Sequence, residues 1–223
     1  MQKIITFMAF MVLVVMSTNA LCKSNVSQPT SSESKEFERA KQVRGTSNFS
    51  SEYYEFEAAG YQYRINRDGS GTREHKDMPT LFFDIDLLKP HHEQIDAIVY
   101  YAEFKGDLLL ICGTKLDDSG SAIVRRLRGD SLKIKWKQRI KAFNVGPGLI
   151  KGDYAYLTAI GFVGKINLVT GKYAWKHDGL YRSGLYNSFQ IPSIIGDRIR
   201  FKDKDGSAFV EVDDRLGKII KVD

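Results

Sequence analysis

The residues of this sequence best suited to bind a charged ligand form one alternating stretch in the second half of the chain. Lysine or arginine stands at every second position, with mostly apolar residues between; the cations are Lys133, Lys135, Lys137, Arg139 and Lys141. Alternate side chains of a β-strand point to the same face. The stretch therefore predicts a strand with a positive ridge roughly 26 Å long, suited to a phosphate-bearing polymer or to anionic lipid head groups.

The same lysine-rich strand also has a purely structural explanation. Lysines on the outermost strand of a sheet keep that edge from pairing with the edge of another chain. A strand of this kind needs no ligand to account for its charge. Anion binding by these five residues is one hypothesis, edge protection is the other, and one strand can serve both purposes.

A second group of residues has side chains of the kinds that bind metals. The sequence runs His91-His92-Glu93, and Asp96 follows closely. Adjacent histidines point to different sides of an extended chain, so they do not make the one-face pair that zinc hydrolases use. We interpret the group as an incidental surface cluster and predict no metal site, with a hydrolase at the His91–Asp96 loop as an alternative function.

Motifs of the common enzyme classes are missing from the sequence. It contains no Gly-x-Ser-x-Gly, no His-Glu-x-x-His and no glycine-rich phosphate loop, which are the patterns of serine hydrolases, zinc proteases and nucleotide-binding proteins. We therefore predict no catalytic residue and no cofactor. The residues leave catalysis unsupported without excluding it.

The N-terminal region has a different character from the rest of the chain. Lys3 precedes an apolar run over residues 4–16, and Ser17-Thr18-Asn19-Ala20 follows it, an order typical of a secretory signal. We predict a signal peptide over residues 1–20 and hence a periplasmic or secreted protein. Cys22 leaves lipid attachment, as in a bacterial lipoprotein, as the alternative.

Residues 21–50 are rich in Ser, Thr, Asn, Gln, Lys and Glu. A segment of this composition cannot bury enough apolar surface to order itself, and a helix over 34–44 would be transient without a partner. We predict a disordered tether here.

Residues 51–223 are predicted to fold as one all-β domain of repeated units. Three β-rich runs start with Gly-Asp, at Gly106, Gly152 and Gly196, about 45 residues apart. Turns break each run into short strands, and a more divergent copy precedes them around Gly69. Four such units predict a β-propeller-like array of antiparallel four-stranded sheets, in which neighbouring sheets bury faces that none buries alone.

One of these units carries a family resemblance in its motifs. It reads PGLIKGDYAY over 147–156 and GKINLVTGKYAW over 164–175. The unit resembles a blade of the quinoprotein-type β-propellers, the family with pyrroloquinoline-quinone-like repeats, and the resemblance is clearest over 106–223. It implies a radial array of four-stranded blades in which the closing-strand residues Trp136 and Trp175 dock between neighbours.

The resemblance also limits what is expected. The quinone-binding and metal residues of the family's enzymes have no match in this sequence, so no cofactor is carried over. Members commonly have more blades than the roughly four that this chain can hold at its period. A four-bladed ring, an open array, and a half-ring that self-association with a second chain completes all stay open.

The leading hypothesis is an exported, non-enzymatic β-propeller-like interaction or scaffold module of the cell envelope or secreted space. Its partner would be an envelope or secreted protein, an anionic polymer or lipid head groups, because a net charge of +6 at pH 7 favours acidic partners. No specific nucleic acid is expected. The alternatives are a polyanion- or carbohydrate-binding domain that uses the lysine-rich strand, and the hydrolase described above.

The predicted processing can be checked by the intact mass of the exported protein. We expect a chain that begins at Leu21, because the small residues Thr18 and Ala20 stand where signal peptidase requires them. A mass that corresponds to a chain beginning at Cys22 with attached acyl chains would show the lipoprotein alternative. Recovery of the protein only inside the cell, with the first 20 residues intact, would contradict export.

Overall fold

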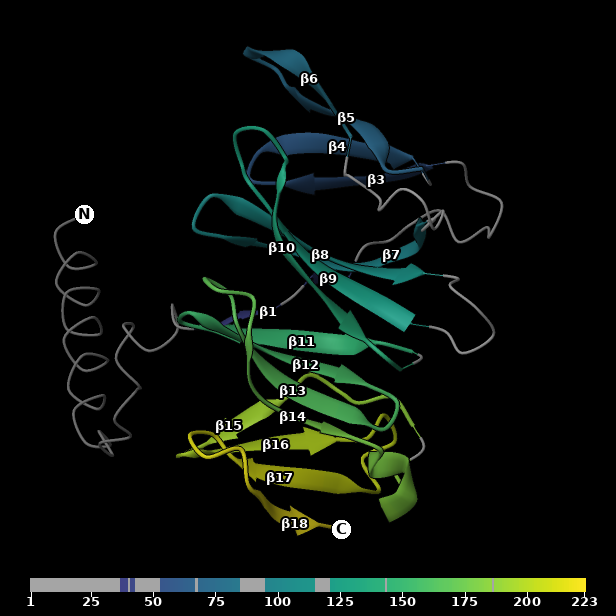
Figure 1. Ribbon diagram of the computed structural model, residues 1–223, viewed down its shortest axis with the longest axis vertical. Helices are drawn as coiled ribbons and strands as arrows, with labels where there is room; N and C mark the ends of the chain where they lie inside the picture. The colour runs from purple at the N-terminus through teal and green to yellow at the C-terminus, as the bar shows by residue number, and fades with distance from the viewer. Residues whose placement is uncertain are drawn as a thin grey trace, which may run out of the picture. The chain divides into compact units, whose positions relative to one another are not determined.

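Four antiparallel sheets make up most of what the computed structural model describes, which is residues 37–39, 41–42, 53–66, 68–84, 95–114, 121–142, 144–185 and 187–223. In each sheet, four strands that are consecutive along the chain lie side by side in chain order (Figure 1). This arrangement confirms the prediction of an all-β, β-propeller-like array of repeated four-stranded units.

The strands of the four sheets have the following bounds. The first sheet contains β3 (Tyr53–Ala58), β4 (Tyr61–Asn66), β5 (Ser70–His75) and β6 (Met78–Asp84). The second contains β7 (Ile95–Phe104), β8 (Asp107–Thr114), β9 (Ser121–Leu127) and β10 (Ile134–Ile140). The third contains β11 (Gly146–Lys151), β12 (Tyr154–Ala159), β13 (Phe162–Asn167) and β14 (Tyr173–Asp178). The fourth contains β15 (Ser193–Ile195), β16 (Arg198–Lys202), β17 (Phe209–Asp213) and β18 (Ile219–Val222).

Each unit of the predicted sequence repeat corresponds to one of these four sheets. In each sheet the first hairpin turns at a glycine with positive φ, and these glycines are Gly60, Gly106, Gly152 and Gly196. A two-residue hairpin requires this left-handed backbone, which glycine adopts without strain. The three predicted starts of the repeat therefore share one structural position, and Gly60 marks it in the divergent first copy.

A β-bulge recurs at one place in all four sheets. The register between the third and fourth strands shifts by one residue near the turn that joins them. Beyond each shift, a third-strand residue lies opposite an equivalent fourth-strand residue, and these pairs are Arg73 with Leu81, Arg126 with Trp136, Lys165 with Trp175, and Glu211 with Lys221. The bulges align the four copies residue by residue.

Apolar clusters join each sheet to the next one along the chain. One cluster unites the first and second sheets, a second cluster unites the second and third, and a third cluster unites the third and fourth. All seven positions of β9 are buried; its Val124 packs toward the third sheet and its Leu127 toward the first. The second sheet is thus covered on both faces, which explains the continuous apolar run over residues 108–112 of β8.

Two short strands come from the segment predicted to be a tether. β1 (Phe37–Arg39) pairs with β11 of the third sheet, and β2 (Lys41–Gln42) pairs with β7 of the second. These residues form strands instead of the transient helix that the composition allowed. An exposed strand edge offers backbone hydrogen bonds to any extended segment, so pairing here does not need an apolar sequence. The rest of the predicted tether and the whole predicted signal peptide lie outside the described residues.

Polar contacts join neighbouring sheets at one repeated point. The turn between the third and fourth strands presents a backbone carbonyl to the preceding sheet; we call the carbonyls of Gly129, Leu168 and Asp214 the docking carbonyls. Each accepts a hydrogen bond from a third-strand cation of the preceding sheet. The donors, in chain order, are Arg73, Arg126 at 2.6 Å and Lys165 at 3.0 Å.

Two tryptophans reinforce these contacts. The indole N–H of Trp136 donates to the docking carbonyl of Leu168 at 2.9 Å, and that of Trp175 donates to Asp214 at 3.0 Å. Each ring also lies directly on a glycine of the next sheet, because a Cβ added at Gly171 or Gly217 would lie 2.5 Å from Cγ of the indole. Each tryptophan therefore docks its own sheet onto the following one.

Gly171→Ala tests this fit between indole and backbone. The positive φ of Gly171 alone costs a residue with a Cβ about 1–2 kcal/mol. The new methyl group must also displace Trp136, so we expect the free energy of unfolding to fall by about 3 kcal/mol in total. Denaturation in urea measures the loss.

Gly152→Ala is the matched control, since Gly152 also has positive φ but nothing lies within 4 Å of its added Cβ. We expect only the backbone cost of about 1–2 kcal/mol there. Equal losses in the two variants would show that the indole does not constrain Gly171.

Candidate functional site

The predicted lysine-rich strand is an edge strand, as expected. β10 lies at the end of the second sheet, next to β9. It spans Ile134–Ile140, so Lys133 precedes the strand and Lys141 follows it. Only the three central cations of the predicted ridge are strand residues.

The prediction that all five cations share one face is wrong, because the bulge interrupts the alternation. The register passes from Ile134 opposite Leu127 to Trp136 opposite Arg126, which leaves Lys135 as the extra residue. Lys135 then points to the same side as Trp136, whereas Lys137 lies opposite Arg125 on the other face. Periodicity could not reveal this, since the bulge depends on how β10 pairs with β9.

Lys135 has a structural partner. Its ammonium group lies 2.7 Å from Oδ2 of Asp107, which also accepts a hydrogen bond of 2.5 Å from Nε of Arg126. Burial by itself raises the pKa of the Asp107 carboxyl, but hydrogen bonds from Lys135, Arg126 and the Gly129 backbone outweigh it and hold that pKa below its usual value. The Asp107 carboxylate thus holds Arg126 toward the docking carbonyl of Leu168, and Lys135 binds the same carboxylate.

The other end of the lysine-rich stretch borders a groove between the second and third sheets. Four cations line it, one from β10, one just after β10, one from β14 and one from the 3-10 helix η2 (Leu180–Ser183). These are Arg139, Lys141, Lys176 and Arg182, and with Phe162, Asp178, Gly179 and Tyr181 they form what we call the basic groove.

The third sheet positions its side of the basic groove through η2. Leu180 is buried and donates its backbone N–H to the carbonyl of Gly161 at 2.9 Å. The ring of Tyr181 covers Gly161, where an added Cβ would lie 2.9 Å from Cδ1. These contacts fix the helix and leave Arg182 exposed at the rim.

The basic groove has an excess of positive charge. Asp178 is its only carboxylate, and that carboxylate pairs with Lys176 at 2.8 Å. Within the described residues, Arg139, Lys141 and Arg182 form no ion pair. Three exposed cations that lack a protein anion around one depression are an arrangement suited to a multivalent anion, and guanidinium groups bind phosphate or carboxylate oxygens in a bidentate manner.

The structure brings together only part of the predicted site. Arg139 and Lys141 line the basic groove, whereas Lys133 and Lys137 do not, and Lys135 is paired with Asp107. Sequence reasoning missed Lys176 and Arg182, which come from a different sheet. Lys176 follows Trp175 as Lys137 follows Trp136, so alignment of the copies on their tryptophans would have drawn attention to Lys176; no sequence signal marks Arg182.

The alternative hydrolase site is not described. Residues 91–94 lie outside the described residues, and of Asp96 only the backbone in β7 is described. In the part of the chain that the structure covers, no three His, Cys, Asp or Glu side chains are grouped so as to hold a metal ion. Nor does any helix of that part have the length and apolar character needed to span a bilayer.

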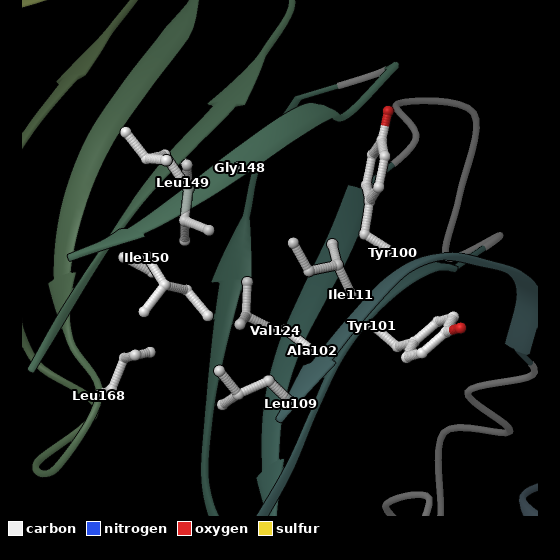
Figure 2. Close-up of a pocket in the computed structure, with 12 residues that line it drawn as sticks. Tyr100, Tyr101, Ala102, Leu109, Ile111, Val124, Gly148, Leu149, Ile150 and Leu168 are labelled. Carbon is white, nitrogen blue, oxygen red and sulfur yellow. The ribbon is translucent and has the colours of Figure 1, made fainter. Parts of the chain in front are cut away.

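A small apolar void lies in the core between the second and third sheets. Figure 2 shows Ile111 and Val124 of the second sheet facing Ile150 of the third across it. Its volume is about 20 Å³, room for about one water molecule, whereas ligand pockets typically enclose 300 Å³ or more. The void is a packing gap, so the basic groove remains the stronger candidate site.

The fold defines the class of this protein: it is β-propeller-like, with docked four-stranded sheets. No protein-family model matches the sequence, and no curated protein matches it.

Solved structures that resemble the chain are propeller proteins of greater length. BamB from Moraxella catarrhalis is 12% identical with a TM-score of 0.46, over 73% of this chain and 49% of that one. AztD from Citrobacter koseri is 12% identical with a TM-score of 0.44, over 75% and 45%. A europium-containing methanol dehydrogenase is 13% identical with a TM-score of 0.48, over 75% and 40%. This chain thus spans less than half the length of each, and likeness at this level carries no argument about what it binds.

The ion pair of Asp107 predicts a dependence of stability on pH. Because the folded chain lowers the pKa of this carboxyl, the pair contributes stability above the unfolded pKa of about 4, and this contribution is lost as the pH falls through the lower folded pKa. At neutral pH we expect Asp107→Asn to reduce the free energy of unfolding by about 3 kcal/mol, since Arg126 loses a buried partner. Urea denaturation across the acidic range measures the difference from wild type.

Asp130→Asn serves as the control, because Asp130 pairs with Arg128 at 2.7 Å on the exposed surface. Exposed pairs contribute little, and we expect a much smaller loss than that of Asp107→Asn. If the deficit of Asp107→Asn stayed constant down to about pH 2, the carboxylate would not be the group responsible.

Proposed function

We propose that this chain is an exported β-propeller-like interaction module, without enzymatic activity, that binds a polyanion of the cell envelope or secreted space in the basic groove. The proposed export is supported by the apolar run and the small residues that end at Ala20. Binding is supported by the groove itself. The observation that carries the proposal is that two sheets converge four cations on one depression that holds a single, already paired carboxylate.

The chemistry of the groove favours a repeating anion over a single small one. Its cations are exposed and come from β10, from the residue just after it, from β14 and from η2, so they do not enclose a single small anion. Exposed lysines and arginines gain affinity chiefly by displacing counterions from a densely charged polymer, which makes binding strongly dependent on salt. The guanidinium groups of Arg139 and Arg182 can each take two oxygens of one phosphate or sulfate group.

Reversing two groove charges tests this function. With inorganic polyphosphate as the probe, we expect Arg139→Glu with Lys141→Glu to weaken binding by at least about 30-fold, because each cation contributes about 1 kcal/mol near an anionic surface. The slope of log affinity against log salt should also fall, by about one for each phosphate contact that is lost. Isothermal titration calorimetry at several NaCl concentrations measures both quantities.

The matched control is Lys133→Glu with Lys137→Glu, which changes the net charge equally but outside the basic groove. We expect this variant to keep most of the affinity and the salt slope of the wild type. Equal losses in the two double variants would mean that only the overall charge of the chain matters. Wild-type protein that does not bind polyphosphate at low salt would refute the proposed function.

A further inference from the structure

The first and fourth sheets each have one face that no apolar cluster of the described residues covers. In the fourth sheet, Phe201 and Val210 pack toward the third sheet, so the neighbouring side chains on β16 and β17 point the other way. In the first sheet, Tyr54 and Phe56 pack toward the second. The outward faces of these two sheets are therefore surfaces with their own chemistry.

The outward face of the fourth sheet is mainly basic. It carries four cations and three carboxylates, and we call Arg198, Arg200, Lys202, Glu211, Asp213, Lys221 and Asp223 the basic face. All three carboxylates have partners within this sheet. Glu211 accepts from Nε of Arg200 at 2.6 Å, Asp213 accepts from the backbone N–H of Leu216 at 2.6 Å, and Asp223 pairs with Lys221 at 2.8 Å. Lys202 is exposed and forms no ion pair within the described residues, and Arg198 is exposed beside Glu211 at 3.8 Å.

The basic face lacks the docking residues of the other sheets. Glu211 stands where the second and third sheets have Arg126 and Lys165, and Lys221 stands where they have tryptophan. The fourth sheet therefore has neither a cation that reaches a docking carbonyl nor an indole that lies on a glycine. Any surface that covers it must be matched by charge instead.

The outward face of the first sheet has the opposite charge. It carries three carboxylates and one cation, and we call Glu55, Glu57, Arg64 and Glu74 the acidic face. The glutamates are exposed, and Arg64 lies over the ring of Tyr53 with Cζ 3.8 Å from its centroid. Each face also exposes an apolar side chain, Phe82 at 78% on the first sheet and Ile195 at 44% on the fourth.

We propose that the acidic face of one copy of this chain binds the basic face of a second copy. The two faces carry net charges of opposite sign, and each also exposes an apolar side chain. A contact between two different faces leaves the other acidic and basic faces free to make the same contact. In a closed dimer this contact is made twice, with the acidic face of each copy on the basic face of the other. The product is a dimer in which all eight sheets have a neighbour on both faces. No residue of the basic groove takes part, so the inference is independent of the proposed function.

Charge exchange between the two faces is the decisive experiment. One variant reverses the acidic face with Glu57→Lys and Glu74→Lys. The other reverses the basic face with Arg198→Glu and Lys202→Glu, which removes the 3.8 Å contact of Arg198 with Glu211 and keeps the closer Arg200–Glu211 contact. Each variant alone presents two faces of like charge, so we expect each to dissociate at least about tenfold more readily than wild type. An equimolar mixture presents opposite charges at both contacts, and we expect it to regain the dimer mass.

Sedimentation equilibrium of the mature protein measures these masses over a range of concentrations. Lys133→Glu with Lys137→Glu, on neither face, should dimerise like wild type. A wild-type protein that stays monomeric at about 100 µM, or folded variants that stay monomeric when mixed, would overturn the proposal. Should a variant fail to fold, the wild type still decides the question: its association must weaken as NaCl is raised, and association insensitive to salt overturns the proposal.

Discussion

One backbone carbonyl in each of three turns holds the sheets of this protein in order. The docking carbonyls of Gly129, Leu168 and Asp214 each accept from a cation of the preceding sheet, and two of them also accept from an indole N–H. Hydrogen bonds that involve a charged donor contribute about 1.5–3 kcal/mol each. The donors always come from the earlier sheet and the acceptor from the later one, which gives the array a direction that apolar packing alone would not specify.

The same constraint explains the burial of two cations, Arg126 and Lys165. Arg126 is buried, yet its guanidinium group has both a carboxylate partner in Asp107 and a carbonyl partner in the next sheet. Lys165 is satisfied in the same way, by the carbonyl and the carboxylate of Asp214. A buried cation is tolerated only when paired and hydrogen-bonded, so these residues fix how two sheets meet while the apolar clusters supply most of the stability.

Much of the fold could be predicted from the sequence, because the features that determine it are local. The Gly-Asp starts at Gly106, Gly152 and Gly196 mark hairpins whose backbone requires glycine, and the alternating apolar residues between them require sheets. The prediction that the lysine-rich stretch has all its cations on one face was wrong, because a bulge accommodates one extra residue, Lys135. Only the pairing with β9 determines this bulge. The strands β1 and β2 were missed for a related reason: they are held by backbone pairing at sheet edges, to which composition gives no guide.

Two of the four cations of the basic groove could be predicted from the sequence. Arg139 and Lys141 belong to a conspicuous pattern within one strand, but the groove exists only where that strand meets β14 and η2, which lie dozens of residues later in the chain. A linear pattern shows which side chains share a strand; it does not show which strands of neighbouring sheets converge. Lys176 becomes visible when the copies are aligned on their tryptophans, whereas Arg182 depends on a short helix outside the repeat.

At each sheet junction, the size of the fourth-strand side chain is matched to the size of the turn residue that it meets in the next sheet. Where an indole docks, as with Trp136 and Trp175, the turn of the next sheet that it contacts has a glycine. At the first junction the aligned positions are Leu81 and Leu132. Leu132 keeps a positive φ of 55° in its turn. The two residues that meet at each junction belong to successive copies of the repeat. Recombination that exchanged whole copies would therefore separate them, and the segment that can be inherited or grafted intact runs from the docking tryptophan of one sheet to the turn of the next.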